Sequence, residues 1–240
     1  MNPPLFYSSA IATVGEFIEL NEGNAKHIFQ VLRMKTGDQV QLTNGQGICA
    51  TAIINAISKK NCKVLISSET SVPAPVHRIT VAISLLKNAG RFEWFLEKAV
   101  ETGIHSIIPL ICHRTERQVF REKRMQAILV SAMLQSKQSW LTELTEPVSF
   151  SSFISSAGLR NYHHLYIAHC EAQEKKELSQ IVDQQHNNSL ILIGPEGDFT
   201  LEEINTATAS HFQPVQLGTN RLRTETAGLT AAILLRQLGG

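Results

Sequence analysis

The later part of this chain alternates short apolar runs with stretches in which apolar residues recur every three or four positions. The runs cover residues 79–85, 107–112, 165–170, 190–193 and 215–217. Strands that are apolar on both faces and alternate with helices are typical of a parallel sheet that helices cover on both sides. The pattern therefore predicts an α/β domain.

Helices are predicted between these strands. One face of the first helix carries Phe92, Phe95, Leu96 and Val100, and Gly103 is placed to end it. Further helices are predicted over residues 173–183, 201–209 and 225–238. The order strand, helix, strand thus continues to the end of the sequence.

The segment Ser71–Val76, with two prolines, separates this region from a different one. Before it, strands are predicted over 39–43, 48–58 and 62–67, and one helix over 25–34. Closing a small sheet removes its exposed strand edges. The sequence therefore predicts two domains, a small β-barrel at 1–73 and the α/β domain at 74–240.

Composition narrows the class of protein. Hydrophobic residues make up 43% of the chain and charged residues 18%, which is typical of a globular protein. No apolar stretch reaches the roughly 18 residues that would cross a bilayer, and no secretory signal is visible, so a cytoplasmic protein without a membrane partner is expected. The four cysteines form no CxxC pair and the histidines show no metal-binding spacing, so no metal is expected.

Basic residues are unevenly distributed although the net charge is +1. Residues 78–140 hold ten Lys and Arg against five Asp and Glu. We interpret the densest group as a phosphate-facing surface. A solvated helix face with Glu116 and Glu122 as local partners is the alternative. The group consists of Arg114, Arg117, Arg121, Lys123 and Arg124.

Open parallel sheets bind ligands beyond the carboxyl ends of their strands, which selects segments 168–171, 194–199 and 218–226. Neither a GxGxxG motif nor a P-loop is present, so a nucleotide-like ligand would need another loop arrangement. In 194–199, two glycines and a proline let the backbone approach a ligand. Thr200 and Glu203 fit a capping box, so a turn and helix cap without a ligand is the alternative.

Charged residues also mark the junction between the last strand and the last helix. Arg221, Arg223 and Glu225 alternate there with Leu222 and Thr224. Charges at the end of a buried strand are costly unless they are paired or used. They indicate a binding or catalytic role, with an Arg223–Glu225 ion pair as the alternative. The final helix carries an apolar stripe that indicates core or a dimer interface, formed by Ala231, Leu234, Leu235 and Leu238.

These segments resemble the two C-terminal motifs of the bacterial 16S rRNA uridine-N3 methyltransferases, the RsmE family of the SPOUT superfamily. The matching stretches are 193–199 (IGPEGDF) and 217–227 (LGTNRLRTETA). Residues 27–33 with Gly37 resemble the N-terminal motif of the family, 98–103 its Lys-x-x-Glu-x-Gly motif, and Gln135–Ser136 its Gln-Ser pair. The resemblance covers essentially the whole chain.

The resemblance implies a PUA-like barrel, a SPOUT domain with a C-terminal trefoil knot, a homodimer, and S-adenosylmethionine as cofactor. The implied product is 3-methyluridine in 16S rRNA of the small ribosomal subunit. Beyond the basic group, His27, Arg33 and Arg221 are expected to contact RNA, with a purely structural role as the alternative for His27. The expected cofactor contacts are Ala168, His169, Cys170, Glu171, Ile193, Gly194, Pro195, Glu196, Gly197, Leu217, Gly218, Asn220, Leu222, Arg223 and Thr224.

Three departures from the family pattern stand out. Residues 4–7 lack the arginine that is common at the start of the first strand, which puts one RNA contact in doubt. Residues 137–142 follow the Gln-Ser pair where the family commonly continues with Gly-Arg and a later Val-Pro. Asp198 stands where a second glycine is frequent.

For the reaction, Arg223 is expected to stabilise the negative charge that the uridine ring gains when N3 loses its proton. Glu225 is expected to orient that arginine, with direct acceptance of the proton as the alternative. Two other functions stay open at this point: methylation of tRNA, and RNA binding in ribosome assembly without turnover.

Overall fold

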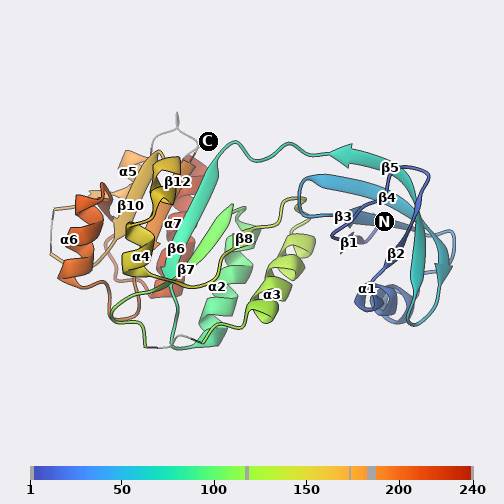
Figure 1. Ribbon diagram of the computed structural model, residues 1–240, viewed down its shortest axis with the longest axis horizontal. Coiled ribbons are helices and arrows are strands. Elements are labelled where there is room, and N and C mark those ends of the chain that lie inside the picture. The colour runs from blue at the N-terminus through green and yellow to red at the C-terminus, as the bar shows by residue number, and fades with distance from the viewer. Residues whose placement is uncertain (1–2, 117–118, 173, 183–187, 239–240) are drawn as a thin grey trace. The chain divides into compact units, whose positions relative to one another are not determined.

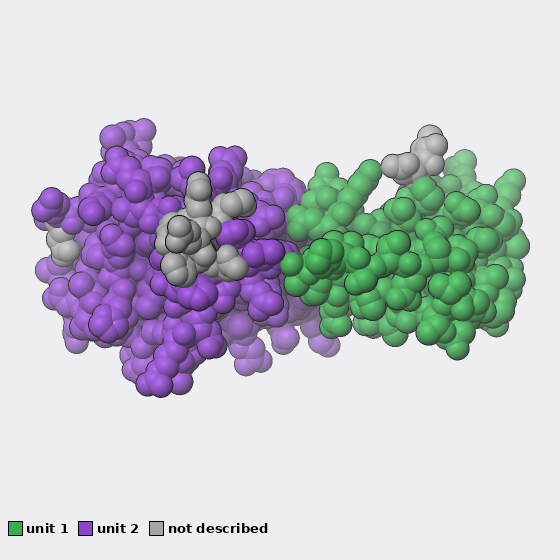
Figure 2. All heavy atoms as spheres, turned by 90° about the horizontal axis from the view of Figure 1, so that it is seen from above, with its two compact units in different colours: residues 1–74, 133–141 green, residues 75–132, 142–240 purple. Residues whose placement is uncertain are grey.

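The computed structural model describes residues 3–116, 119–172, 174–182 and 188–238. The chain divides into two compact units, which are coloured separately in Figure 2. The first unit combines residues 1–74 with 133–141, and the second combines 75–132 with 142–240. Of the described helices, none has the length and apolar character needed to cross a membrane.

The first unit contains a five-stranded sheet and one short helical segment. Its strands are β1 (Leu5–Tyr7), β2 (Phe17–Leu20), β3 (Gln39–Thr43), β4 (Ile48–Ile57) and β5 (Cys62–Ser71). They follow the order β1-β3-β4-β5-β2, so β1 and β2 are the two edges and no pairing between described residues closes the sheet into a barrel. Register shifts at Thr51/Ala52 and Ile54/Ala56 bend β4, which lets the sheet curve around its core without closing.

The helix expected over 25–34 begins earlier and ends earlier. It consists of α1 (Glu22–Lys26), capped by the Asn21 side chain, and the π-helical turn η1 (His27–Val31). Ala25 and Ile28 are fully buried against the inward side chains of the sheet. Alternate residues of β3, Val40 and Leu42, lie in the same core, as the period of two in the sequence predicts.

Residues 133–141 were expected in the second domain, but the structure places them with the first unit. The reason is main-chain pairing: Gly47 donates to the Ser139 carbonyl at 2.9 Å and Leu141 donates to the Gly45 carbonyl at 2.9 Å. The Trp140 indole donates to the carbonyl of Val72 at 3.1 Å. Such pairing between distant segments leaves no periodic signal in the sequence.

The second unit contains the predicted parallel sheet, of which Figure 1 labels β6, β7, β8, β10 and β12. The strand order of the sheet is β11-β13-β10-β12-β6-β7-β8, with β9 beside β7. All of its strand pairs are parallel. The strands are β6 (Arg78–Ser84), β7 (Ser106–Ile111), β8 (Glu143–Leu144), β9 (Val148–Ser149), β10 (His164–Ala168), β11 (Lys176–Glu177), β12 (Asn188–Ile193) and β13 (Gln213–Gln216).

The helices agree with the sequence prediction in part. Gly103, with φ of 79°, follows the end of α2 as expected. The helix expected over 173–183 is reduced to α5, because residues 176–177 form a strand; residues 173 and 183 lie outside the described part. Sequence periodicity missed α3, α4 and the 3-10 helix η2. The helical elements are α2 (Ala89–Glu101), α3 (Glu122–Gln135), α4 (Phe150–Ile154), η2 (Ala157–Asn161), α5 (Leu178–Ile181), α6 (Leu201–Ala209) and α7 (Thr224–Leu238).

The sheet of the second unit is covered on both faces. On one face α4 and α6 bury Phe150 and Ile204 in a core that also includes Leu110 and Leu192. On the other face α7 contacts α2 and β6. The approach is close at Gly228, where a Cβ atom would lie 2.7 Å from the Phe95 ring. This packing brings the start of α7 to the carboxyl ends of the central strands.

Candidate functional site

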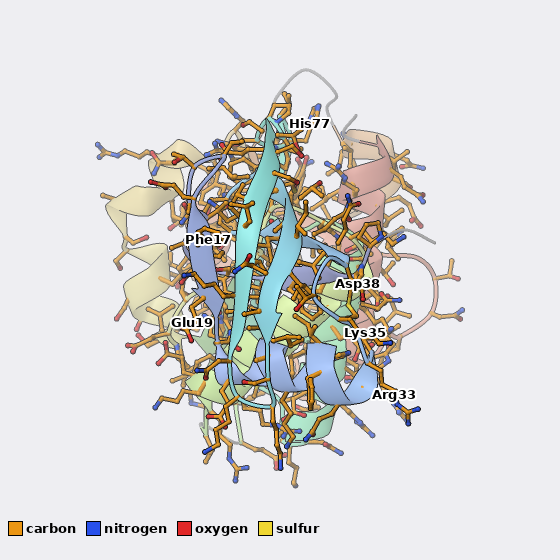
Figure 3. The ribbon with its side chains drawn as sticks, turned by 90° about the vertical axis from the view of Figure 1, so that its right-hand side faces the viewer. Phe17, Glu19, Arg33, Lys35, Asp38 and His77 are labelled. Atoms are coloured by element: carbon orange, nitrogen blue, oxygen red, sulfur yellow. The ribbon has the colours of Figure 1, made fainter. Side chains whose placement is uncertain are left out.

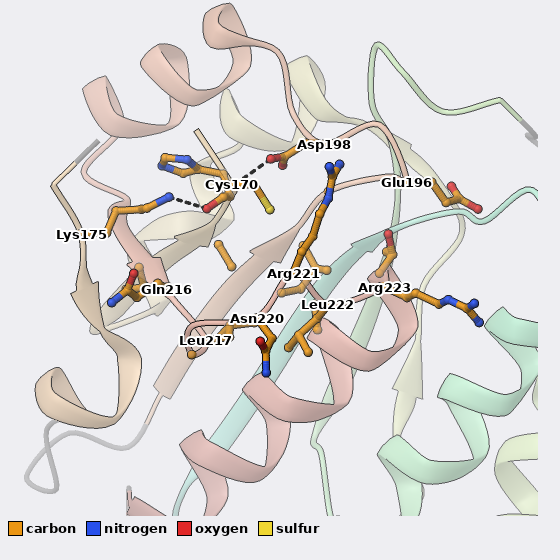
Figure 4. Close-up of a pocket in the computed structure, with 18 of the residues that line it drawn as sticks. Cys170, Lys175, Glu196, Asp198, Gln216, Leu217, Asn220, Arg221, Leu222 and Arg223 are labelled. Atoms are coloured by element: carbon orange, nitrogen blue, oxygen red, sulfur yellow. Dashed lines mark hydrogen bonds between the residues drawn. The ribbon is translucent and has the colours of Figure 1, made fainter. Parts of the chain in front are cut away.

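A cavity of about 710 Å³ lies at the carboxyl ends of β10, β12 and β13, and Figure 4 shows most of its lining. It brings together all three segments that the sequence singled out. The lining residues are Ala168, His169, Cys170, Lys175, Ile193, Gly194, Pro195, Glu196, Asp198, Val215, Gln216, Leu217, Gly218, Thr219, Asn220, Arg221, Leu222, Arg223, Thr224 and Ala227.

Most of the expected cofactor contacts line this cavity, but Glu171 and Gly197 do not. Arg221, expected to contact RNA, does line it. Sequence reasoning also missed Lys175, Asp198 and Gln216 as lining residues. Asp198 lies within the predicted segment 194–199 but was not among the expected cofactor contacts, and Gln216 lies two residues before the segment 218–226, whereas nothing local singles out Lys175.

The 194–199 turn needs glycine at its first position. A Cβ atom on Gly194 would lie 3.1 Å from both the ring and the main-chain nitrogen of Phe199, whose side chain is fully buried. The predicted capping box is confirmed: the Thr200 side chain accepts from the Glu203 amide, and the Glu203 carboxylate accepts from the Thr200 amide. The turn is therefore packed against the buried Phe199 ring and fixed to α6 by the capping box. Most of its residues also line the cavity.

The structure shows how Asp198 is tolerated at a position where glycine was expected. Its φ of 63° is in the left-handed region, where glycine is favoured because it has no Cβ. The Asp198 carboxylate accepts from the Cys170 amide at 2.7 Å and from the Phe199 amide at 2.8 Å. The bond from Cys170 ties the 194–199 turn to the 168–171 turn, and the bond from Phe199 is local, so two hydrogen bonds offset the strain of an aspartate at this position.

Lys175 closes the 168–171 turn from the other side. Its ammonium group donates to the carbonyl of His169 at 2.6 Å and to the carbonyl of Glu171 at 2.8 Å. The carbonyl groups of this turn therefore face a cation, and the turn is held in one conformation. Glu171 contributes this carbonyl although it is not on the cavity wall.

Two titratable groups of this turn are held in their neutral forms. Burial, and after it the Lys175 cation, lowers the pKa of His169. Its two ring nitrogens are buried and have no hydrogen-bond partner among the described residues. Burial, followed by the Asp198 carboxylate, raises the pKa of the Cys170 thiol. Neither group is prepared to act as a nucleophile, and no cluster of three or more metal-ligating residues occurs in the described part of the chain.

The 217–223 turn places two arginines at the cavity. Arg221 and Arg223 are both exposed, with the half-buried Leu222 between them. Figure 4 shows the two side chains leaving the turn in different directions, Arg221 toward the side of Asp198 and Arg223 away from it. Gly218 has φ of 122°, so this turn also depends on glycine. The main-chain carbonyl of Arg223 accepts from the Ala227 amide at 2.7 Å, which begins α7.

Glu225 has a different partner from the one that the sequence suggested. Its side chain is 8% exposed, and its Oε1 lies 3.6 Å from Nε of Arg91 in α2. Among the described residues, no ion pair joins it to Arg223, so that alternative was wrong. The reason is direction: Arg223 precedes the helix and turns outward, whereas Glu225 in the first helical turn faces α2. Glu225 does not line the cavity.

Three loops on this edge of the sheet are tied together. Glu196 accepts from the Lys87 amide at 3.1 Å, which links the turn after β12 to the loop after β6. Arg114 donates to the Gly197 carbonyl at 2.6 Å, and Glu203 accepts from the His113 amide at 2.8 Å. Arg114, expected to contact RNA, therefore also supports the 194–199 turn.

The other basic residues have different surroundings. Arg124 forms a two-bond ion pair with Glu93, with Nη2 to Oε2 at 2.7 Å, instead of pairing with Glu116 or Glu122. Arg121 and Lys123 are exposed and form no ion pair within the described residues. Arg117 lies outside the described residues.

His27 and Arg33 belong to the first unit. His27 is exposed and packs edge-on against the Phe6 ring, with the ring centroids 5.9 Å apart. Arg33 is exposed, has φ of 54°, and extends from the chain near Lys35 and Asp38 (Figure 3). The two residues are therefore accessible, as RNA contact would require.

Comparison with known proteins gives a consistent family. The profile described as RNA methyltransferase domain matches residues 72–236, and the profile described as RNA methyltransferase PUA domain matches residues 20–67. The ribosomal RNA small subunit methyltransferase E of Synechocystis is 30% identical over 228 residues, which cover 92% of this chain and 73% of that protein.

Solved structures of similar proteins indicate the same family. A probable rRNA methyltransferase from Porphyromonas gingivalis has a TM-score of 0.89 and 34% identity, and the match covers 98% of each chain. The ribosomal RNA small subunit methyltransferase E of Neisseria gonorrhoeae, solved bound to S-adenosyl methionine, has a TM-score of 0.88 and 26% identity, covering 99% of this chain and 98% of that one.

Proposed function

Since this chain belongs to the RNA methyltransferase family that includes the ribosomal RNA small subunit methyltransferases E, we propose that it methylates N3 of one uridine in 16S rRNA. The observation that carries the proposal is the cavity at the carboxyl ends of β10, β12 and β13, where main-chain turns meet Arg223. The PUA-like unit at 1–73 is proposed to bind RNA and the unit at 74–240, apart from 133–141, to carry the reaction.

S-adenosylmethionine is the cofactor, and the cavity fits it. A volume of about 710 Å³ suits a ligand of nucleoside size. Apolar side chains of the lining, among them Ile193, Leu217 and Leu222, offer a surface for the adenine ring. Gly218 is exposed on the cavity wall, and a Cβ atom there would meet nothing within 4 Å, so its main chain is accessible to a ligand. When bound, S-adenosylmethionine supplies a methyl group that its sulfonium makes electrophilic.

In the proposed reaction the protein binds and orients the uridine and stabilises its deprotonated form. N3 gives its proton to solvent water, and the bond that then forms between N3 and the methyl carbon replaces the bond from that carbon to sulfur. Loss of the proton leaves negative charge shared between N3 and the two ring carbonyl oxygens. Arg223, exposed on the cavity wall, is proposed to stabilise that charge with its guanidinium group.

Glu225 is proposed to orient an arginine, not to accept the N3 proton. Its carboxylate is buried beside the cavity wall and not on it. The guanidinium that it contacts belongs to Arg91, at 3.6 Å. The orienting role therefore applies to Arg91 rather than Arg223.

RNA phosphates are proposed to contact the exposed basic residues, namely Arg121, Lys123 and Arg221 in the second unit and Arg33 with His27 in the first. Such contacts position RNA without reading its bases. Arg124 contributes less charge because Glu93 neutralises it.

Two further properties of the family are proposed for this chain. One is a homodimer, which the partly exposed apolar residues Leu229, Ile233 and Leu234 of α7 support. Light scattering that gives the mass of one chain would contradict it. The other property is a trefoil knot at the C-terminus. After β13, which lies outside β10 and β12 in the sheet, the chain crosses back and packs α7 against β6. An experimental structure whose backbone is unknotted would contradict this proposal.

One assay tests the function directly. The protein is incubated with S-adenosylmethionine labelled in its methyl group and with small ribosomal subunits from cells that lack this methylation. We expect label in 16S rRNA, at N3 of one uridine, when the nucleosides are analysed by mass spectrometry. Label in tRNA offered in parallel, or cofactor binding without any transfer, would overturn the proposal.

A further inference from the structure

The Arg91–Glu225 pair joins two helices next to the cavity. Arg91 lies in the first turn of α2, and Glu225 lies in the first turn of α7. The side chains are unequally covered, with Arg91 40% exposed and Glu225 8% exposed. The pair therefore holds a guanidinium group at the protein surface through a carboxylate that is inside.

The arrangement leaves hydrogen-bonding capacity unused on both sides. Nε of Arg91 faces Oε1 of Glu225, and the side chain of Arg91 has no other polar partner among the described residues. Oε2 of Glu225 is buried without a hydrogen bond in the same part of the chain. A buried carboxylate with an unsatisfied oxygen lowers stability. A pair with a purely structural role would avoid this cost if the guanidinium donated hydrogen bonds to both carboxylate oxygens. The two Nη groups of Arg91 stay available for an anion.

Arg91 is connected on two sides to residues that line the cavity. Glu225 directly follows Thr224, which lines the cavity. On the other side, α2 starts after the loop whose Lys87 amide is bonded to Glu196, another lining residue. Arg91 itself is not on the wall, so it is positioned for a ligand that extends out of the cavity.

We infer that Arg91 binds an RNA phosphate next to the target uridine and that Glu225 is the positioning residue that holds it there. The planar guanidinium fork suits a phosphate, since two parallel hydrogen bonds can form while Nε stays with Glu225. Two other cations near this end of α2 are already paired: Lys87 pairs with Glu116 at 2.6 Å, and Arg124 pairs with Glu93. The inference rests on the proposed function, because it assumes RNA as the substrate.

The test compares the variants Arg91→Ala, Arg91→Lys and Glu225→Gln, with Lys98→Ala as control. Lys98 lies on the same helix, and its ammonium is paired with Glu97 and Glu101, so its removal deletes the same charge without touching Glu225. Unmodified small ribosomal subunits and labelled S-adenosylmethionine are the substrates. Circular dichroism melting and size-exclusion chromatography check that each variant keeps its fold and oligomeric state.

For Arg91→Ala we expect KM for the subunits to rise about tenfold, with S-adenosylmethionine affinity unchanged. The slope of log affinity against log salt should fall by about 1, as for loss of one phosphate contact. Arg91→Lys should restore part of the affinity, because it keeps the charge but not the fork. Lys98→Ala should change neither quantity.

Glu225→Gln separates positioning from proton transfer. As a positioning residue it should raise KM for the subunits with little change in kcat, and the double variant with Arg91→Ala should be no worse than Arg91→Ala alone. A collapse of kcat with an altered pH profile would assign Glu225 to proton transfer and overturn the inference. Unchanged KM and salt slope in Arg91→Ala would overturn it too, whereas a parent protein that methylates no RNA would instead refute the proposed function.

Discussion

At the scale of single residues, the site depends on a few backbone conformations and a few charges. Asp198 and Gly218 have positive φ angles in turns that line the cavity. Arg223 is exposed on the cavity wall, whereas Glu225, two residues later, is buried away from it. Neighbouring positions therefore have separate roles, and single substitutions can test them separately.

Arg223→Ala should abolish most methyl transfer while the protein still binds S-adenosylmethionine. Loss of a group that stabilises developing charge typically lowers kcat by about 100- to 1,000-fold. Calorimetry with the cofactor and single-turnover transfer to small subunits measure the two effects. Undiminished transfer would remove Arg223 from the mechanism.

Asp198 offers a matched pair of substitutions. Asp198→Ala removes both carboxylate hydrogen bonds and keeps a Cβ at φ of 63°, so unfolding free energy should fall by about 2 kcal/mol and cofactor affinity should weaken. Asp198→Gly also removes the bonds but relieves the backbone, so it should lose about 1 kcal/mol less. Urea denaturation and cofactor titration compare the two proteins. Equal losses would show that backbone strain at this position is unimportant.

At the scale of elements, the placement of α7 against β6 and α2 determines where the site residues before it lie. The contact depends on Gly228, since a Cβ atom there would lie 2.7 Å from Phe95 and 2.9 Å from Ile83. Both neighbours are buried core residues and cannot easily move. A small residue in the helix is thus a packing requirement.

Gly228→Ala sets two opposing effects against each other. In an exposed helix interior the change would stabilise the protein by up to about 1 kcal/mol. Here we expect overpacking to dominate, with a loss of roughly 1–3 kcal/mol in unfolding free energy. Gly158→Ala is the matched control, because its Cβ would meet only the Ser156 hydroxyl at 3.7 Å. A stabilised Gly228→Ala protein would mean that the α7 contact is looser than described.

At the scale of the whole molecule, two histidines of the second unit link its stability to pH. Burial is the main cause that lowers the pKa of His105 and of His169 below 6.5. In the unfolded chain both groups take up a proton near their ordinary pKa, whereas the folded protein holds them neutral. The unfolded state therefore binds more protons below pH 6.5, and stability falls as pH decreases through that window.

The contribution of these histidines to the unfolding free energy should be constant above about pH 7. The unfolding free energy, measured by urea denaturation, should decline between about pH 6.5 and 5. His169→Gln combined with His105→Gln should flatten this part of the pH dependence. His211→Gln, at an exposed position, is the control and should leave it unchanged. The same slope in all proteins would assign the acid sensitivity to other groups.

The parallel sheet, the capping box at Thr200 and the three ligand-facing turns were predictable from the sequence, because each follows from local periodicity or from spacing within a few residues. Periodicity failed for α3, α4 and the short strand β11. Elements of two to five residues are too short to show a period, and α3 has apolar residues around much of its surface. Their existence is fixed by the surface on which they pack.

The tertiary structure alone decided which distant groups meet. The sequence placed Glu225 beside Arg223, but in the folded protein its partner is Arg91, which precedes it by 134 residues, because helix direction controls where a buried carboxylate points. Folding likewise brought Lys175 onto the 168–171 turn and residues 133–141 into the first unit. Local sequence patterns determine which segments can form a ligand-binding turn. The partner of a buried charge depends on how separate elements pack together, and no short stretch of sequence contains that information.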